Sequence, residues 1–201
     1  MGRGAEYVAI GPADLLEPLQ PLLDWRSAQG LNVVAVPLEA VYDQFGHGMP
    51  EPQAVQDFMA YAAATWRPAP AYLLLVGDAT YDPRGHLTAP EANRLPAFLV
   101  QTVYGGETAS DVFFGQLDDD LWPEIAVGRI PARNPEQVRA VVDKTLAYEK
   151  QIVGREWEGR VLAVADGQSP SFQQDALAFL SLFPERYQTE LFAPPVGSVA
   201  A

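Results

Sequence analysis

The 201-residue sequence contains no cysteine. A chain without thiols cannot form a disulfide, a thiolate metal site or a cysteine nucleophile. Histidine is scarce as well, with only His47 and His86, so a metal-dependent phosphoesterase site, which usually needs several imidazoles, has few ligands available. By themselves, these 201 residues therefore cannot carry out cysteine-dependent catalysis.

Basic residues are also few, with 13 Lys and Arg against 26 Asp and Glu and a net charge of -13. Phosphate binding needs basic side chains clustered on one face, so we expect no nucleic-acid partner. No stretch approaches the roughly 18 consecutive apolar residues of a membrane helix, and residues 1–4 lead into the first expected strand without a signal-peptide core. We therefore expect no membrane partner, and an acidic surface that favours divalent cations.

Hydrophobic residues make up 48% of the chain, enough for one large α/β domain or two small ones. Short apolar runs alternate with segments whose apolar residues recur at three- and four-residue spacing. The runs predict strands at 6–10, 31–38, 71–76, 124–128, 160–165 and 188–192, with a hairpin formed by 96–103 and 108–115. The spaced segments predict helices at 15–25, 39–45, 52–66, 135–153 and 171–183. The continuous run 31–38 is typical of a strand buried on both faces.

This alternation predicts an α/β fold in which a parallel sheet carries helices on both faces, with residues 71–76 at its centre. Residues 1–155 form a first α/β subdomain, and residues 156–201 begin a second series of strands and helices. We expect that second part to be incomplete. An unfinished sheet leaves an edge and apolar surface uncovered, which predicts pairing with another copy of the chain.

Candidate sites lie in the loops after residues 76, 127 and 165, because ligands gather beyond the carboxyl ends of the strands in an open parallel sheet. The first loop contains Asp78 and Asp82, whose carboxylates could hold a cation in a metal-dependent hydrolase. The alternative for Asp78 is a structural role, in which it accepts hydrogen bonds from loop amides and holds the turn.

A second group of carboxylates lies around and after the second strand of the expected hairpin. Several carboxylates in one loop can supply the oxygen ligands that calcium prefers, although the spacing is not that of an EF-hand. The group predicts a structural calcium site, with a solvated acidic turn as the alternative. Its members are Asp111, Asp118, Asp119, Asp120 and Glu124.

His47 stands in the turn Gly46-His47-Gly48, an arrangement that could expose an imidazole for catalysis. It follows an expected helix instead of a strong strand, and no cysteine is available to pair with it. We interpret His47 and His86 as exposed loop histidines, and we assign no catalytic residue. The sequence also lacks a Gly-x-Ser-x-Gly elbow, a Walker loop and a dinucleotide fingerprint.

Five short segments follow one another along the chain: Asp24-Trp25-Arg26 with Gly30-Leu31, then YLLLVGD at 72–78, SDVFFGQL at 110–117, IAVGRIP at 125–131 and TLAYE at 145–149. Together, over about residues 6 to 165, they resemble the gingipain-type family of cysteine peptidases. Each segment is weakly specific by itself. Their shared order makes the resemblance fairly specific.

The resemblance implies a caspase-like fold with two side-by-side α/β subdomains, the second of which carries a Cys and His dyad. In the family, both dyad residues lie later in the second subdomain than this chain reaches. We therefore expect a fragment of the peptidase domain that is inactive by itself. The implied partners are the remainder of that domain and, in the parent protein, a protein or peptide substrate. The implied location is extracellular or at the cell surface.

In arginine-specific members of the family, an acidic residue binds the cationic side chain of the substrate. This residue lies near the start of the helix that follows the first strand of the second subdomain. The closest register places Ser171 at that position, with Asp166 and Asp175 nearby, so arginine specificity is not supported. The alternative for Ser171 is a helix N-cap. Two other functions stay open, a non-catalytic binding or assembly domain of the same fold, and a metal-dependent hydrolase centred on Asp78 and Asp82.

Overall fold

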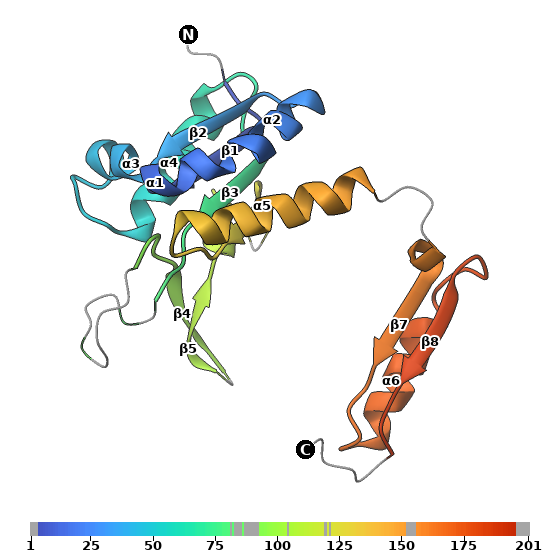
Figure 1. The fold of residues 1–201 in the computed structure, drawn as a ribbon. Helices are drawn as coiled ribbons and strands as arrows, with labels where there is room; N and C mark the ends of the chain where they lie inside the picture. The colour runs from blue at the N-terminus through green and yellow to red at the C-terminus, as the bar shows by residue number, and fades with distance from the viewer. Residues whose placement is uncertain are drawn as a thin grey trace. The chain divides into compact units, whose positions relative to one another are not determined.

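The computed structural model describes residues 4–80, 82, 86, 93–103, 105–118, 120, 122–151 and 156–195. The chain forms two compact units, Met1–Glu149 (unit 1) and Lys150–Ala201 (unit 2). The boundary between them lies close to the expected division at residues 155 and 156. Figure 1 shows the helices and strands of both units.

Unit 1 is built on a four-stranded parallel sheet with the strand order β2-β1-β3-β6. The strands are β1 (Tyr7–Gly11), β2 (Val33–Pro37), β3 (Tyr72–Val76) and β6 (Ala126–Ile130). The prediction of a parallel α/β sheet with residues 71–76 at its centre is confirmed. The expectation that residues 31–38 are buried on both faces is wrong, because β2 is an edge strand and is only half buried.

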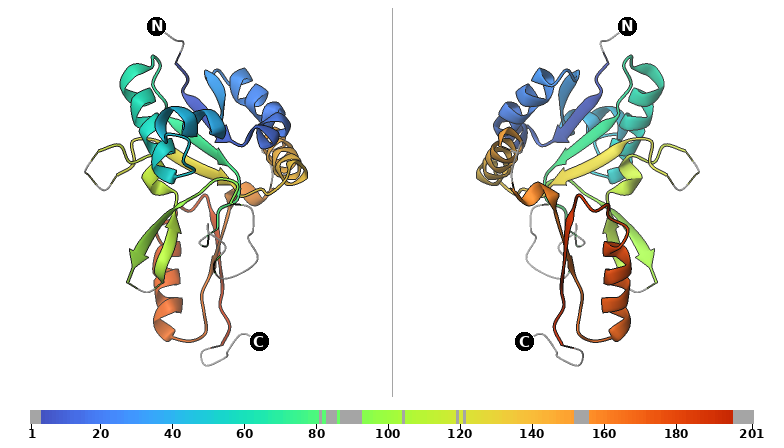
Figure 2. Two further views of the ribbon diagram at one scale, coloured as in Figure 1. Left: turned by 90° about the vertical axis from the view of Figure 1, so that its left-hand side faces the viewer. Right: turned by 90° about the vertical axis from the view of Figure 1, so that its right-hand side faces the viewer.

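Helices cover both faces of this sheet (Figure 2). Alternate residues of a strand point to opposite faces, so Val8 and Ile10 of β1 pack on one side and Ala9 packs on the other. The first side is covered by α3 (Leu38–Phe45), α4 (Pro52–Thr65) and the 3-10 helix η2 (Val112–Phe114). The second side is covered by α1 (Ala13–Leu16), η1 (Glu17–Leu19), α2 (Gln20–Ala28) and α5 (Pro135–Lys150). The expected two-sided cover is confirmed for unit 1.

Proline and glycine set the ends of the first helices. The single helix expected at 15–25 is divided into α1, η1 and α2, because Pro18 and Pro21 lack the amide that a continuous helix requires. After α2 the backbone turns at Gly30, whose φ of 95° lies in the left-handed region that favours glycine. The Gly30 amide donates to the Ser27 carbonyl at 3.0 Å and closes the helix end.

The predicted hairpin is present between β3 and β6, but the second strand expected at 108–115 ends at Ser110, and residues 112–114 form η2. Its strands, β4 (Phe98–Thr102) and β5 (Gly106–Ser110), pair antiparallel as a two-stranded sheet. The ring of Phe98 packs against Phe113 and Phe114, with ring centroids 5.7 and 5.0 Å apart. These contacts connect the hairpin to the core beneath η2.

The strand β6 lies two positions further along the chain than the expected strand at 124–128. Gly128 and Arg129 therefore lie within the strand, opposite Leu74 and Leu75 of β3, and not in the loop that follows. An arginine inside a strand must find acceptors for all of its N–H groups if it is to be buried.

Unit 2 contains the 3-10 helix η3 (Glu156–Gly159), β7 (Arg160–Val164), α6 (Pro170–Leu180) and β8 (Gln188–Phe192). The two strands pair in parallel, and α6 contacts both of them. The strand, helix and strand expected from the sequence are confirmed. No helix among the described residues of the chain is long and apolar enough to cross a membrane.

Candidate functional site

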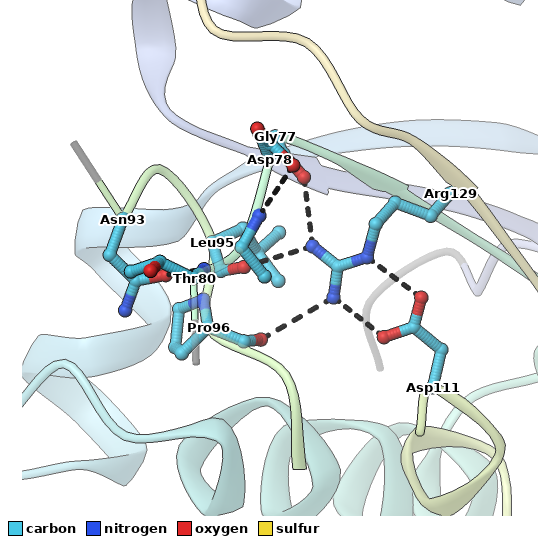
Figure 3. Close-up of polar contacts among 9 residues, drawn as sticks. Gly77, Asp78, Thr80, Asn93, Leu95, Pro96, Asp111 and Arg129 are labelled. Atoms are coloured by element: carbon cyan, nitrogen blue, oxygen red, sulfur yellow. Dashed lines mark hydrogen bonds and ion pairs between the residues drawn. The ribbon is translucent and has the colours of Figure 1, made fainter. Parts of the chain in front are cut away.

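At the carboxyl edge of the unit 1 sheet, the side chain of Arg129 donates hydrogen bonds to several polar groups (Figure 3). Its Nε and Nη2 donate to the two carboxylate oxygens of Asp111, both at 2.7 Å. Nη1 donates to the carbonyls of Gly77 at 2.8 Å and Leu95 at 2.9 Å, and Nη2 also donates to the carbonyl of Pro96 at 3.4 Å. Because a guanidinium has five N–H donors, this arrangement uses its full capacity.

The pairing of Arg129 with Asp111 fixes the base of the loop that joins β3 to β4. The Arg129 side chain is 11% exposed and the Asp111 side chain 31% exposed, so the pair is largely shielded from water. A planar, bidentate contact of this kind sets both distance and orientation. We expected Asp111 to be a calcium ligand, whereas in the structure its carboxylate pairs with the largely shielded guanidinium of Arg129.

Asp78 holds the start of the same loop. Its backbone carbonyl accepts from the amides of Arg94 at 3.0 Å and Leu95 at 3.1 Å, which brings the two ends of the loop together. Its carboxylate accepts from the Ala79 amide at 3.0 Å and from Arg133 Nε at 2.6 Å. These contacts are those of the structural alternative, in which Asp78 holds the turn.

In the same loop, Oδ1 of Asp82 accepts a hydrogen bond from the His86 amide at 2.9 Å. Within the part of the chain that the structure describes, neither Asp82 nor Asp78 belongs to a group of three metal-ligating side chains. The hypothesis of a metal-dependent hydrolase centred on these two carboxylates therefore gains no geometric support from the described residues.

Three of the expected calcium ligands do converge. One carboxylate oxygen each from Asp118, Asp120 and Glu124 lies within 4.8 Å of the others, and all three side chains are exposed. Each carboxylate also accepts a backbone amide: Asp120 N donates to Asp118 at 2.9 Å, Trp122 N to Asp120 at 2.6 Å, and Leu117 N to Glu124 at 2.6 Å. Asp119 lies outside the described residues. Among the described members of the expected set, these three converge and Asp111 pairs with Arg129.

A cleft of about 580 Å³ lies beside the Arg129 contacts. Its lining is mostly apolar and includes one charged residue, Glu51. No local pattern in the sequence indicates this cleft, since one wall comes from residues 49–52 and the other from the loop between β3 and β4 and from β4 itself. The lining residues are Met49, Pro50, Glu51, Pro52, Thr80, Asn93, Pro96, Ala97 and Leu99.

A second ion pair joins α2 to the end of α5. Arg26 donates to both carboxylate oxygens of Glu149, at 2.6 and 2.7 Å, and the indole Nε1 of Trp25 donates to the same carboxylate at 2.7 Å. The hydrogen bonds from Arg26, with that from Trp25, lower the pKa of Glu149 from its ordinary value of 4.5 to about 2. Glu149 is therefore held as a carboxylate at neutral pH.

The expected pocket residues of unit 2 are all exposed. The N-cap of α6 is Ser169, whose hydroxyl accepts from the Ser171 amide at 3.3 Å, so the assignment of the cap to Ser171 is wrong. Asp166 accepts the Gln168 amide at 2.7 Å and holds the turn before the helix. Asp175 lies one helical turn after Ser171 on α6.

The two histidines occupy the surface positions expected of loop residues. His47 is exposed between α3 and α4 with a φ of 52°, and His86 is exposed in the loop after β3. Their side chains therefore face solvent.

The sequence profile of Peptidase family C25 matches residues 2–193, and the chain belongs to this family. Among curated relatives, Gingipain R2 of Porphyromonas gingivalis is 23% identical over 168 residues, which cover 83% of this chain and 20% of that protein. Lys-gingipain of the same species is 24% identical over 151 residues, covering 71% of this chain and 7% of the relative. The chain thus spans about a fifth of Gingipain R2 and less than a tenth of Lys-gingipain.

Solved structures of the family share the fold. The Arg-specific cysteine proteinase gingipain R matches with a TM-score of 0.71 at 21% identity, over 96% of this chain and 41% of its own. Dimeric latent PorU from Porphyromonas gingivalis matches with a TM-score of 0.63 at 24% identity, over 87% of this chain and 20% of its own. The expected caspase-like α/β fold is confirmed.

The segments that carry the family resemblance meet at two ion pairs, Arg129 with Asp111 and Arg26 with Glu149. The segments 72–78, 110–117 and 125–131 supply Gly77, Asp111 and Arg129. The segments 24–26 and 145–149 supply the pair formed by Arg26 and Glu149. Each pair joins parts of the chain that are separated in sequence.

Proposed function

We propose that this chain forms the first subdomain and the beginning of the second subdomain of a C25 cysteine peptidase, and that it supports the fold without supplying the catalytic dyad. The support for this proposal is a family match over residues 2–193 in a chain that has no cysteine. In a cysteine peptidase, a thiolate activated by an imidazole attacks the peptide carbonyl. That chemistry would come from polypeptide outside these 201 residues.

The parent protein would cleave protein or peptide substrates. The partner of this chain would be the remainder of the peptidase domain. We also propose an extracellular or cell-surface location for the parent, on the strength of the family resemblance. Ser171, Asp166 and Asp175 are candidates for one wall of the substrate pocket, since they follow the first strand of unit 2.

The first test is a peptidase assay on the purified 201-residue chain. We expect no turnover of casein or of small Arg, Lys or apolar peptide substrates, because no thiol is present to form an acyl-enzyme. The readout is release of a fluorescent leaving group, with and without a thiol alkylating reagent. Reproducible turnover that the reagent abolishes would contradict the proposal, and turnover that resists the reagent would point to a different hydrolase.

A binding role for the same fold is the second candidate. The observation that favours it is the cleft of about 580 Å³, which lies entirely within unit 1 and needs no residue of unit 2 for its walls. A parent polypeptide without thiol-dependent turnover would favour this candidate over the first.

We propose that Asp118, Asp120 and Glu124 form a structural calcium site. At calcium tenfold above its dissociation constant, the expected stabilisation of about 1.4 kcal/mol corresponds to a rise in Tm of roughly 3–5 °C. Glu124→Gln should remove this rise, because it deletes one of the three converging charges, whereas Glu107→Gln on β5 should leave it intact. Calorimetry with and without calcium decides the point. No shift of the wild-type Tm in 10 mM calcium would remove the site.

A further inference from the structure

The apolar cleft of unit 1 has one charged group in its lining, the carboxylate of Glu51. Glu51 directly precedes α4, and its side chain makes no capping hydrogen bond with that helix. Among the residues that the structure describes, none forms a hydrogen bond or an ion pair with this carboxylate. An ionised acceptor without a protein partner is suited to a cationic donor on a ligand.

The part of unit 1 around Glu51 carries little positive charge. Residues 27–66 contain four acidic residues, one histidine and neither Lys nor Arg. This range forms β2, α3 and α4, and its residues 49–52 make one wall of the cleft. Beside the cleft, Arg129 already uses its donors on Asp111 and on loop carbonyls. The charge of the cleft is therefore complementary to a cation.

The opposite wall offers a hydrogen-bond donor, the side-chain Nδ2 of Asn93. The side-chain oxygen of Asn93 accepts from the Thr80 amide at 3.3 Å, which orients the side chain. Nδ2 points away from Thr80 and makes no hydrogen bond within the described part of the chain (Figure 3). Because an amide nitrogen donates, it requires an acceptor on the ligand, such as a carbonyl oxygen.

Both walls are fixed by contacts that need no ligand. On the first wall, the Met49 amide donates to the Gly46 carbonyl at 2.8 Å. On the second wall, the Pro96 carbonyl accepts from Arg129 Nη2 at 3.4 Å. A preformed site loses little conformational freedom when a ligand binds, so its few polar groups can select the ligand.

The size and lining of the cleft suit an apolar group next to the cation. Its volume of about 580 Å³ lies within the range of roughly 300–1,000 Å³ that is typical of small-ligand sites. Pro50, Pro52, Ala97 and Leu99 supply apolar contact surface. Met49, which also lines the cleft, is 54% exposed, so the cleft is open to solvent and can admit the end of a longer chain.

We infer that this cleft binds the free amino terminus of a peptide whose first side chain is apolar. The α-ammonium pairs with Glu51, the first carbonyl accepts from Nδ2 of Asn93, and the first side chain contacts the apolar lining. A peptide amino terminus carries these three groups within one residue, whereas a Lys or Arg side chain has no carbonyl beside its cation. The inference rests on the binding role proposed for this fold and is independent of thiol chemistry.

The test uses the 201-residue chain and the peptide Leu-Ala-Ala-Gly with fluorescein at its carboxyl end, with binding followed by fluorescence anisotropy. We expect N-acetylation of the peptide to raise the Kd about tenfold, because it removes the charge that pairs with Glu51. Glu51→Gln should raise the Kd of the free peptide by a similar factor and abolish its advantage over the acetylated peptide. Glu39→Gln is the control, an exposed position on α3 outside the lining of the cleft, and should change neither value.

Competition by leucinamide and isopentylamine tests the contact with Asn93. The two compounds share the ammonium and the apolar group, but only leucinamide has a carbonyl. We expect leucinamide to compete about fivefold more strongly for the wild-type chain, as one further hydrogen bond implies. Asn93→Asp should remove this difference, because it keeps the oxygen that accepts the Thr80 amide and deletes the donor.

Equal affinities for the free and acetylated peptides, or no binding of the free peptide at about 1 mM chain, would overturn the inference. Isopentylamine that competes as strongly as leucinamide would also overturn it, by showing a site for amines in general. The acetylated peptide decides the point on the wild-type chain even if Glu51→Gln does not fold. Peptidase activity is measured in a separate assay, so failure of the peptidase proposal and failure of this binding are distinct results.

Discussion

Arg129→Met is expected to lower the free energy of unfolding of unit 1 by about 3 kcal/mol. The substitution keeps an unbranched apolar stem, removes the guanidinium and leaves the Asp111 carboxylate without its partner in a largely shielded position. It also leaves the carbonyls of Gly77 and Leu95 without their side-chain donor. Removing one member of a largely shielded pair costs more than the pair contributes, because the remaining charge stays partly desolvated. Urea unfolding followed by tryptophan fluorescence gives the value.

The matched control is Arg139→Met on α5. The Arg139 side chain is 50% exposed and pairs with Glu17 and Glu136 at 3.6 and 3.4 Å. Exposed ion pairs contribute little, so we expect a change within about 0.5 kcal/mol. Arg129→Lys should not restore stability, because an ammonium cannot reproduce the planar, bidentate contact with Asp111. Similar losses for the Arg129 and Arg139 substitutions would show that the Arg129 contacts have no special structural role.

Glu149→Gln is expected to destabilise unit 1 by about 1–2 kcal/mol at pH 7, after allowance for solvent screening of a partly exposed pair. The folded-state pKa of Glu149 is lowered from 4.5 to about 2, chiefly by its hydrogen bonds with Arg26. A lowered pKa stabilises the fold at pH values above the unfolded pKa, and the stabilisation is lost as the pH falls from about 4.5 toward 2. The difference between wild type and Glu149→Gln should therefore shrink in this window.

Thermal unfolding at pH 7, 4 and 2.5 measures this effect. Glu136→Gln is the control on the same helix, because its carboxylate is 75% exposed and its contact with Arg139 is at the surface. The control should follow the wild-type pH profile. A Glu149→Gln protein with wild-type stability at pH 7 would mean that the contact between α2 and the end of α5 does not hold unit 1 together.

The sequence predicted the parallel sheet well because its inner strands are uninterrupted apolar runs. The segment Tyr72–Val76 could hardly be placed elsewhere than in the centre, and it lies between β1 and β6. The edge position of β2 was not predictable from a run of the same kind, since edge or centre depends on which strands pair. The break in the first helix could have been predicted from Pro18 and Pro21.

The register of β6 shows where reasoning from local sequence fails. The sequence predicts a strand at 124–128 and leaves the charged Arg129 outside it, whereas β6 continues to Ile130. In the structure the charge of Arg129 is neutralised by Asp111, 18 residues away in sequence, and its N–H groups reach carbonyls of a different loop. A long-range ion pair of this kind has no local signal, and it allows a charged side chain within a strand to be largely shielded from water.

The sequence predicts the acidic residues as one group, but the structure separates them according to the groups that they contact. Asp111 pairs with Arg129, while Asp118, Asp120 and Glu124 converge at the surface. In unit 2 the helix was predicted correctly, but its cap was placed at Ser171 and not at Ser169. Two serines at a helix start differ only in backbone geometry, which the sequence does not contain. The extended backbone of Ser169 lets its hydroxyl accept the Ser171 amide.

The proposed function depends on the claim that the fold of a C25 peptidase is present here while the thiol chemistry lies outside residues 1–201. The most direct test compares peptide hydrolysis by the 201-residue chain with hydrolysis by a longer C25 polypeptide that contains it. We predict no turnover by the first, and turnover by the second that a thiol alkylating reagent abolishes. Thiol-independent turnover by the 201-residue chain, or a folded longer polypeptide without thiol-dependent activity, would contradict the account.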